Sequence, residues 1–261
     1  MPELPEIEAY RMLAEQLALD RPIAEVRAPD AWYLKGGTDA ASLRGALIGA
    51  SLRRARRRGK LLLLDVDPAA VLSLRFGMTG RLVVDDVAAV GDLLYATRRQ
   101  DAVYDRFGLV FADGGRLVVR DPRRLGGVEL DPAEDRLGPD ARTLTPAELR
   151  DALAGGSGPL KARLMDQARV AGIGNLLADE ILWRAGLSPL RPAGGLSPAE
   201  LRRLRTHIVG SVERAIERGG SHTGDLMIAR RRGGRCPRDA APLARDQVGG
   251  RTTWWCPAHQ H

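Results

Sequence analysis

The sequence of 261 residues has few cysteines and no long hydrophobic run. Its two cysteines, Cys236 and Cys256, are too few for a disulfide framework, and both lie in the last tenth of the chain, as metal ligands can. No apolar stretch reaches the length of a membrane span, and the start lacks the basic-then-apolar pattern of a secretion signal. These absences exclude a disulfide-rich secreted domain and a transmembrane protein, and predict a soluble, cytoplasmic protein.

Lysine and asparagine are also scarce. Among 40 basic residues only Lys35, Lys60 and Lys161 are lysines, and Asn175 is the only asparagine. The chain is rich in Ala, Gly, Leu, Val and Arg, which we interpret as a bias of its coding sequence. Against that background, the rare residues carry more information than the common ones.

The charge balance points to the kind of partner. The net charge is +7 and the isoelectric point is about 10.1, which favours a polyanion such as nucleic acid or an acidic membrane surface. The length allows two domains of average size, each with a sizeable core.

The first half of the chain has the pattern of a β domain that follows a helix. Residues 5–19 place apolar side chains at positions 7, 10, 14 and 17, on one helical face. Short segments rich in Val and Leu follow, separated by Gly, Asp and Pro, at residues 61–66, 71–76, 81–84, 102–111 and 116–119. We therefore predict an N-terminal β-sandwich domain with an N-terminal helix over residues 1–131.

The second half reads as helical. Residues 132–144 contain Asp-Pro and Gly-Pro dipeptides and are predicted to be a linker. Thr145 and Ser197 each precede Pro-Ala-Glu, the pattern of an N-cap with proline in the first helical turn. The predicted fold class is α+β in two domains. The second half has a helical domain with a helix-two-turn-helix over residues 145–225 and a zinc-finger-like β-hairpin over residues 226–261.

Two predicted helices, residues 160–170 and 175–185, are separated by a tight turn that contains two glycines. We place Asn175 at the N-cap of the second helix, where unpaired amides and the helix dipole can bind a phosphate. A helix pair of this kind is also a common packing unit. The position of the only asparagine favours contact with nucleic acid.

The chain begins Met-Pro-Glu-Leu-Pro-Glu. Removal of the initiator Met leaves Pro2 as a free secondary amine, close in sequence to Glu3 and Glu6. Such an amine can attack a carbonyl carbon and form an iminium, as catalytic lysines do, from a starting pKa of roughly 8. The alternative is that these residues form only a stiff lead-in to a helix.

The tail carries two pairs of potential metal ligands. Cys236 and Asp239 are spaced C-x2-D, and Cys256 and His259 are spaced C-x2-H, with sixteen residues between the pairs. This spacing predicts one structural zinc ion in a two-hairpin module, and His261 is an alternative to Asp239 as the fourth ligand. A second alternative is a decayed metal site in which Trp254, Trp255 and packing hold the hairpin.

Together these residues resemble the formamidopyrimidine-DNA glycosylase and endonuclease VIII family, whose members remove oxidised bases and nick the DNA. The resemblance spans nearly the whole chain. Besides the start and the tail, it includes Arg58-Gly59-Lys60, Gly77-Met78-Thr79-Gly80, Asp121-Pro122-Arg123-Arg124-Leu125-Gly126, Leu137-Gly138-Pro139-Asp140, and the segment from Asp166-Gln167 to Ala178-Asp179-Glu180.

The resemblance implies a DNA glycosylase with abasic-site lyase activity in base-excision repair. Pro2 is expected to attack C1′ of the damaged nucleotide, and Glu3 to protonate the opening sugar ring. Glu6 is expected to position the sugar or relay protons. Lys60 is expected to hold the adjacent phosphate and keep the pKa of the amine low.

The family also supplies expectations for DNA contacts. Met78, Arg123 and Leu125 match the residues that fill the gap left by a flipped nucleotide, with Arg123 bonding the unpaired base and the other two acting as apolar wedges. Leucine at 125 departs from the phenylalanine common in the formamidopyrimidine branch, which leaves the opposite-base preference open. Three further residues match positions that bind phosphates around the lesion: Lys161, Asn175 and Arg251.

The segment between Ser221 and Cys236 is short for the 8-oxoguanine-specific branch, in which a longer loop caps the flipped base. We therefore expect oxidised pyrimidines or ring-opened purines as substrates, with His222 and Thr223 lining the base pocket. The expected partner is double-stranded damaged DNA, bound by a nucleoid-associated monomer of bacterial type with no organic cofactor and no membrane. The alternative is a non-catalytic damaged-DNA-binding protein of the same fold.

Overall fold

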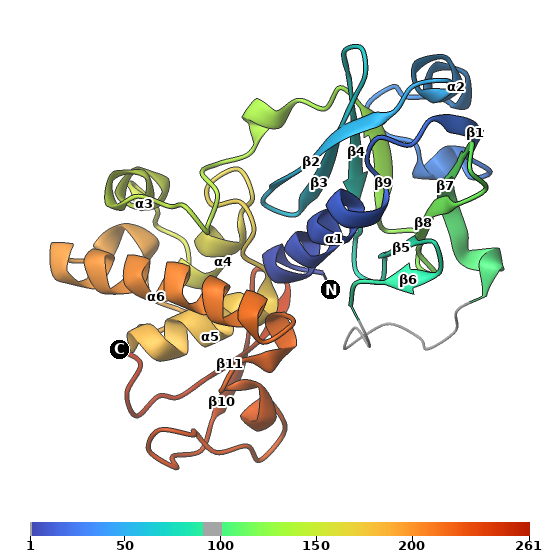
Figure 1. The fold of residues 1–261 in the computed structure, drawn as a ribbon. Helices are drawn as coiled ribbons and strands as arrows, with labels where there is room; N and C mark the ends of the chain where they lie inside the picture. Colours follow the sequence, from blue (N-terminus) through green and yellow to red (C-terminus); the bar gives the residue numbers. More distant parts are fainter. Residues whose placement is uncertain (1, 91–100) are drawn as a thin grey trace. The chain divides into compact units, whose positions relative to one another are not determined.

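The structure is a computed structural model that describes residues 2–90 and 101–261 (Figure 1). The chain divides into two compact units. The first contains Pro2 and residues 6–134, and the second contains residues 3–5 and 135–261. Among the described residues, no helix combines the length and the apolar character needed to cross a bilayer.

The first unit is built from two antiparallel sheets. A five-stranded sheet has the order β1 (Ile23–Arg27), β7 (Asp105–Phe111), β8 (Arg116–Arg120), β5 (Arg81–Val84), β6 (Val87–Ala88). A four-stranded sheet has the order β2 (Leu52–Arg58), β3 (Leu61–Val66), β4 (Ala70–Arg75), β9 (Gly127–Leu130). Among the described residues, the short 3-10 turns Ala31–Tyr33 and Ala102–Tyr104 accompany them, and a further turn, Glu134–Arg136, lies at the boundary between the two units.

The two sheets share one core. Leu109 and Leu117 of the five-stranded sheet belong to the same buried cluster as Leu62 and Leu72 of the four-stranded sheet, together with Tyr10 of helix α1 (Leu4–Leu17). Helix α2 (Ala40–Leu47) adds two more buried leucines to the cluster. The predicted β-sandwich with an N-terminal helix is confirmed.

Strand β2 is one that the sequence pattern does not predict, because it reads Leu-Arg-Arg-Ala-Arg-Arg-Arg. It is an edge strand whose arginines find carboxylate partners. Arg53 bonds Asp20 and Asp67, and Arg56 bonds Asp65 and Glu134. The pairing with β3 and these ion pairs outweigh the low strand propensity of the charged sequence.

The second unit is helical, as predicted, and ends in a β-hairpin. Its helices are α3 (Pro146–Leu153), α4 (Leu160–Met165), α5 (Asn175–Ala185) and α6 (Pro198–Glu217), and its hairpin strands are β10 (Ala244–Val248) and β11 (Arg251–Trp255). The 3-10 turns Ala193–Gly195, Ser221–Thr223 and Met227–Ala229 connect them. The predicted capping boxes at Thr145 and Ser197 start α3 and α6.

Helix α4 is shorter than the predicted residues 160–170. After Met165 the chain turns, because the Asp166 carboxylate accepts from the Ala168 amide and the Gln167 side chain bonds the Gly172 amide and the Met165 carbonyl. Side-chain bonds of this kind compete with helical backbone bonds. The finer predicted division of the chain, at residues 131, 144 and 225, stays a prediction.

Candidate functional site

The start of the chain is bound to the turn before α5. Glu3 is buried, and its carboxylate accepts hydrogen bonds from the backbone amides of Gly174 at 2.9 Å, Leu176 at 2.8 Å and Leu177 at 3.1 Å. A helix N-terminus leaves amides unpaired and carries the positive end of the dipole, so it stabilises a carboxylate. Because Pro2 directly precedes Glu3, Pro2 is one residue from this anchored side chain.

Asn175 is the first helical residue of α5 rather than its N-cap, which corrects the prediction. The N-cap is Gly174, and the acceptor that caps the helix is supplied by Glu3. A Cβ at position 174 would lie 2.3 Å from Cδ of Glu3, so glycine leaves the space that the carboxylate occupies. The sequence pattern does not reveal this cap, because its donor and acceptor are 171 residues apart.

Lys161 is fully buried, which argues against the direct phosphate contact expected from the sequence. Its ammonium lies 2.7 Å from Oδ1 of Asp179 and donates to Oδ1 of Asn175 at 2.6 Å and to Oγ1 of Thr253 at 2.7 Å. Burial lowers the pKa of Lys161, and the Asp179 carboxylate opposes this shift. Because Lys161 donates to the amide oxygen of Asn175, the NH2 group of that amide takes no part in this bond.

Arg251 is exposed at the start of β11, next to the hairpin turn. The turn residues Gly249 and Gly250 have φ angles of 57° and 70°, which glycine adopts without strain. The hairpin is fixed to α5, because the Trp254 amide donates to Oδ2 of Asp179 at 3.2 Å. Arg251 is therefore an exposed cation on an anchored hairpin.

Glu6 and Lys60 belong to segments that are joined to each other. Glu6 is buried in the first turn of α1, and Lys60 lies in the turn between β2 and β3. Arg57, at the end of β2, donates to Glu8 of α1 at 3.0 Å and to the carbonyl of Gly59 at 3.1 Å. The largely buried Arg57 and Glu8 side chains thus connect the Lys60 turn to α1.

Met78, Arg123 and Leu125 lie on two loops of the first unit, residues 76–80 and 121–126. Leu125 is 49% exposed although it is a large apolar side chain, and Arg123 is also exposed. Gly77 has a φ of 56°, and a Cβ there would lie 2.4 Å from the carbonyl carbon of Leu125. The two loops are therefore in direct contact, and the three predicted gap-filling residues are on them.

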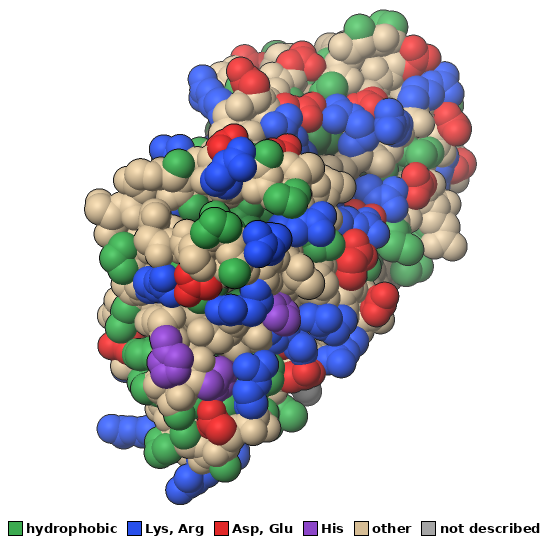
Figure 2. Space-filling model, turned by 90° about the vertical axis from the view of Figure 1, so that its left-hand side faces the viewer, with side chains coloured by type: hydrophobic (Ala, Val, Ile, Leu, Met, Phe, Trp, Pro, Cys, Tyr) green, Lys and Arg blue, Asp and Glu red, His purple; other side chains and the backbone are tan. Residues whose placement is uncertain are grey.

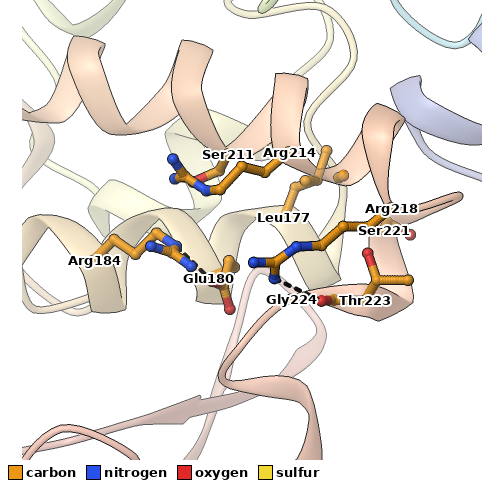
Figure 3. A pocket seen from close by; sticks show the side chains of 10 residues that line it. Leu177, Glu180, Arg184, Ser211, Arg214, Arg218, Ser221, Thr223 and Gly224 are labelled. Atoms are coloured by element: carbon orange, nitrogen blue, oxygen red, sulfur yellow. Dashed lines mark hydrogen bonds and ion pairs between the residues drawn. The ribbon is translucent and has the colours of Figure 1, made fainter.

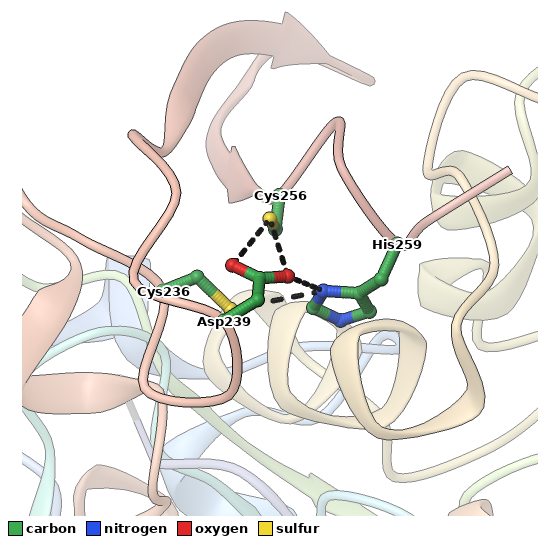
Figure 4. A group of neighbouring side chains, drawn as sticks. All are labelled: Cys236, Asp239, Cys256 and His259. Carbon is green, nitrogen blue, oxygen red and sulfur yellow. Dashed lines mark hydrogen bonds and ion pairs between the residues drawn. The ribbon is translucent and has the colours of Figure 1, made fainter.

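The four predicted metal ligands come together in the tail (Figure 4). Cys236, Asp239, Cys256 and His259 each offer one ligand atom, and these atoms lie within 4.8 Å of one another. Nδ1 of His259 is 2.7 Å from Oδ2 of Asp239, and Sγ of Cys256 is 3.4 Å from both oxygens of that carboxylate. His261 is outside the cluster, and its backbone bonds the chain after α5 instead.

Neighbouring groups orient these side chains. The Trp183 indole donates to Sγ of Cys236 at 3.2 Å, and the Trp183 carbonyl lies 3.3 Å from Nε2 of His259. A proton on Nε2 satisfies that carbonyl and leaves Nδ1 free for a metal. Trp183 is a part of this cluster that sequence reasoning misses, because it lies more than fifty positions before Cys236.

The chemistry of the cluster suits zinc. Burial, aided by the Asp239 carboxylate, raises the pKa of the Cys256 thiol to about 11. The Ala241 amide and the His259 imidazole lower the pKa of Asp239. A zinc ion displaces thiol protons on binding and accepts a tetrahedral set of sulfur, nitrogen and oxygen ligands, so the residues fit the metal.

A small cavity lies between α5, α6 and the turn that follows α6 (Figure 3). Its volume of about 10 Å³ is space for about one water molecule. Glu180 accepts from Arg184 at 2.6 Å and from the Leu226 amide at 2.9 Å. Thr223 lines the cavity but His222 does not, and the space is far too small for a base.

Basic side chains are spread widely over the surface. Figure 2 shows Lys and Arg side chains at many points of one face, with Asp and Glu side chains between them. Many arginines have carboxylate partners, such as Arg21 with Asp85 and Asp113. The positive net charge on this face is therefore distributed rather than concentrated in one stripe.

Comparison with known families gives two matches that together cover most of the chain. Residues 1–128 match the formamidopyrimidine-DNA glycosylase N-terminal domain, and residues 137–226 match the formamidopyrimidine-DNA glycosylase H2TH domain.

Several relatives carry the same description. The chain is 33% identical over 298 aligned positions to the formamidopyrimidine-DNA glycosylase of Jannaschia sp., with all of both chains covered. It is 36% identical over 242 positions to that of Cereibacter sphaeroides, covering 88% of this chain and 83% of the relative.

Solved structures with a similar fold include Lactococcus lactis Fpg bound to DNA. One complex contains N7-benzyl-Fapy-dG and has a TM-score of 0.84 at 26% identity, with all of both chains covered. Another contains an abasic site and has a TM-score of 0.83 at 25% identity, with 99% of both chains covered.

Proposed function

Because this chain belongs to the formamidopyrimidine-DNA glycosylase family, we propose that it combines base excision with strand cleavage at the resulting abasic site, using Pro2 as the nucleophile. Family membership makes the chain a DNA glycosylase of base-excision repair. The lyase step, the proline mechanism and the identity of the lesion are the parts that we propose.

The observation that best supports the proposal is the binding of Glu3 to the amides of Gly174, Leu176 and Leu177. These bonds hold the start of the chain against the turn that carries Asn175. A nucleophile at the N-terminus needs such an anchor, because free chain ends are otherwise poorly ordered. Pro2 is therefore the direct sequence neighbour of a residue that is held at the N-terminus of α5, beside Asn175.

The reaction then follows from ordinary imine chemistry. The neutral Pro2 nitrogen attacks C1′ and the N-glycosidic bond breaks. The proton that the Pro2 nitrogen loses is balanced by the one that the departing base takes up. Glu3 supplies a proton to the ring oxygen as the sugar opens to an iminium. Loss of a C2′ proton expels the 3′ phosphate, a second elimination expels the 5′ phosphate, and water releases the remaining sugar fragment from Pro2.

The other residues hold the substrate. We propose that Lys60, Asn175 and Arg251 bind phosphates beside the lesion, that Lys161 acts through Asn175, and that Glu6 positions the sugar. Cys236, Asp239, Cys256 and His259 would hold a zinc ion, which would make the hairpin that carries Arg251 more rigid. The proposed substrates are oxidised pyrimidines and ring-opened purines in double-stranded DNA, and the proposed active form is a monomer.

Borohydride trapping tests this proposal. The purified protein is mixed with duplexes that contain an abasic site, thymine glycol, dihydrouracil, 8-oxoguanine or formamidopyrimidine, and reduction converts the iminium into a stable adduct. We expect an adduct with wild type and none with Pro2→Gly, and we expect Glu3→Gln to form it more slowly.

The matched control is Pro5→Gly, which alters a second proline of the same opening segment but leaves the nucleophile. The ranking of duplexes identifies the lesion. Absence of an adduct on every duplex, including the abasic one, would overturn the enzyme mechanism and leave a non-catalytic binder of damaged DNA.

A further inference from the structure

The two loops that carry Met78, Arg123 and Leu125 converge on one buried carboxylate. Asp121 is fully buried, and Oδ1 accepts from the Thr79 hydroxyl at 2.6 Å and from the Arg123 amide at 3.2 Å. Thr79 directly follows Met78 and is itself 2% exposed. Oδ1 of Asp121 therefore accepts from Thr79, the neighbour of Met78, and from the backbone of Arg123.

The second carboxylate oxygen fixes the rest of the loop. Oδ2 of Asp121 accepts from the amides of Leu125 at 2.9 Å and Gly126 at 2.8 Å, and from the Tyr33 hydroxyl at 3.4 Å. Burial and the nearby Asp121 carboxylate raise the pKa of Tyr33, which keeps its hydroxyl a donor. All five donors come from the first unit, and three of them are backbone amides within five residues of Asp121.

Close packing also links the two loops, independently of the hydrogen bonds to Asp121. Gly77 is in direct contact with the Leu125–Gly126 peptide, because a Cβ at Gly77 would lie 2.4 Å from the carbonyl carbon of Leu125 and 2.6 Å from the Gly126 nitrogen. A Cβ at Gly126 would lie 2.2 Å from the carbonyl oxygen of Arg75. Neither loop can shift without displacing the other, since interiors at this density transmit strain.

The Arg124 side chain, between Arg123 and Leu125 in the same loop, forms an ion pair with Asp30. Arg124 has a φ of 55°, and its guanidinium donates two hydrogen bonds of 2.6 Å to Asp30. The hydrogen bonds from Arg124 outweigh burial and lower the pKa of Asp30. With Arg124 held in this way, the exposed side chains of Arg123 and Leu125 on either side of it are the ones available to DNA.

We propose that Asp121 is the positioning residue that makes the two gap-filling loops act as one unit, so that Met78, Arg123 and Leu125 enter the DNA together. The inference rests on the proposed function, because it assigns these three residues to filling the gap left by a flipped nucleotide. Asp121 contacts neither base nor sugar in this role. Its effect is on how fast and how completely the gap is filled.

The choice of substitution follows from the donors. Asparagine is nearly the same size, but its NH2 group must face either the Thr79 and Arg123 side or the Leu125 and Gly126 side, and a donor then meets a donor. The Thr79 hydroxyl can turn round and accept, whereas the Arg123 amide cannot. Asp121→Asn therefore releases Arg123 first, and Thr79→Val removes the bond between the loops while leaving the others.

The test uses a duplex with a tetrahydrofuran abasic analogue, which lacks the base and the C1′ oxygen and therefore cannot form the iminium, and 2-aminopurine as the opposite base. Entry of the gap-filling residues changes the stacking of 2-aminopurine and therefore its fluorescence. We expect the fluorescence change to be slowed about tenfold in Asp121→Asn, because hydrogen bonds to a charged group are among the stronger ones. Thr79→Val should be slowed less, and the double variant should show less than the sum of the two effects.

The matched control is Asp113→Asn, which makes the same change at an exposed turn of the same unit, where the carboxylate bonds Gly115 and Arg21. Circular dichroism confirms folding, and Gly77→Ala provides a second route to separate the loops if Asp121→Asn does not fold. Wild-type kinetics in Asp121→Asn and Gly77→Ala, or strictly additive effects with Thr79→Val, overturn the inference. No fluorescence change with wild type indicates instead that the proposed function has failed.

Discussion

Two clusters in the second unit stabilise a carboxylate in different ways, one fully buried at Asp179 and one exposed at Asp239. In the cluster beside α5, Asp179 meets two cations of the protein, Lys161 at 2.7 Å and Arg230 at 2.8 Å. In the tail cluster, the Asp239 carboxylate meets two thiols and an imidazole at Cys236, Cys256 and His259. The first cluster contains its own counter-ions, whereas the second gathers groups whose natural counter-ion is a metal.

Under the proposed function, the two clusters support DNA binding in two different ways. The cluster beside α5 is complete as the chain folds, so its contribution to Asn175 needs no further component. The tail cluster would be fully ligated only with a bound ion, so we expect its folding to be linked to metal concentration. Substitutions within each cluster should therefore affect stability directly at Lys161 and affect metal binding at the tail cluster.

The largest loss of stability is expected from a substitution in the cluster of Lys161, Asp179 and Arg230 beside α5. Lys161→Met keeps the length of the side chain but leaves the Asp179 and Asn175 oxygens without the ammonium. Removal of one partner of a buried ion pair costs about 3 kcal/mol or more of unfolding free energy. Urea unfolding followed by circular dichroism measures the loss, and a loss below about 1 kcal/mol would contradict the importance of this pair.

Lys35→Met is the matched control, because Lys35 is a partly exposed cation beside Trp32. A salt titration of DNA binding adds a second distinction. Arg251→Ala should reduce the slope of log affinity against log salt by about 1, since one phosphate contact is lost. Lys161→Met should weaken binding with little change of slope, because a buried lysine releases no counter-ion from DNA.

In the tail cluster, zinc binding should depend on the ligand residues, including the unusual ligand Asp239, and should be weakened by a chelator. We expect about one zinc ion per chain by elemental analysis, lost in Cys256→Ala and reduced in Asp239→Ala. Asp239→Cys restores the more usual thiolate ligand and should bind zinc about tenfold or more tightly in competition with a chelator. His261→Ala is the control, because His261 lies outside the cluster.

Stoichiometric zinc in Asp239→Ala, with unchanged resistance to the chelator, would remove Asp239 from the ligand set. Zinc-free wild type that keeps its melting temperature when zinc is added would instead favour the alternative of a decayed site held by packing. Trp255, whose indole donates to Asp246 at 2.6 Å, belongs to that packing.

The sequence predicts these regions unequally. The C-x2-D and C-x2-H spacings predict the tail cluster, because both ligands of each pair are local and only one long-range contact is needed. The surroundings of Lys161 cannot be predicted in the same way, since its partners lie 14 to 92 residues away. The helix cap supplied by Glu3 is missed for the same reason.

The sheets show a similar limit. Strands β3 and β5 are predicted with their observed bounds, because their Val and Leu content is decisive. Strands β1 and β9, helix α2 and the arginine-rich β2 are not predicted. Their place depends on pairing and ion pairs with distant segments, which override local propensity. Asp121 lies within a recognised motif, yet only the structure shows its five donors.

The smallest effect is expected where a charge is neither deeply buried nor dependent on a metal. The carboxylate of Glu200 bonds Arg191 and the amide and hydroxyl of Ser197 at the start of α6, and its side chain is 20% exposed. These bonds lower the pKa of Glu200 from 4.5 to about 2, with Arg191 as the largest cause. Because the folded pKa is the lower one, the contribution to stability is complete above pH 4.5 and is lost as the pH falls towards 2.

Glu200→Gln should therefore cost about 0.5–1 kcal/mol of unfolding free energy at pH 7, where solvent screens the pair, and progressively less below pH 4.5. Urea unfolding of wild type and variant at several pH values measures the difference, and Glu217→Gln at the exposed end of the same helix is the control. A difference that stays constant from pH 7 to pH 3 would show that the charge of Glu200 is not what stabilises the cap, and would leave its hydrogen-bonding shape as the cause.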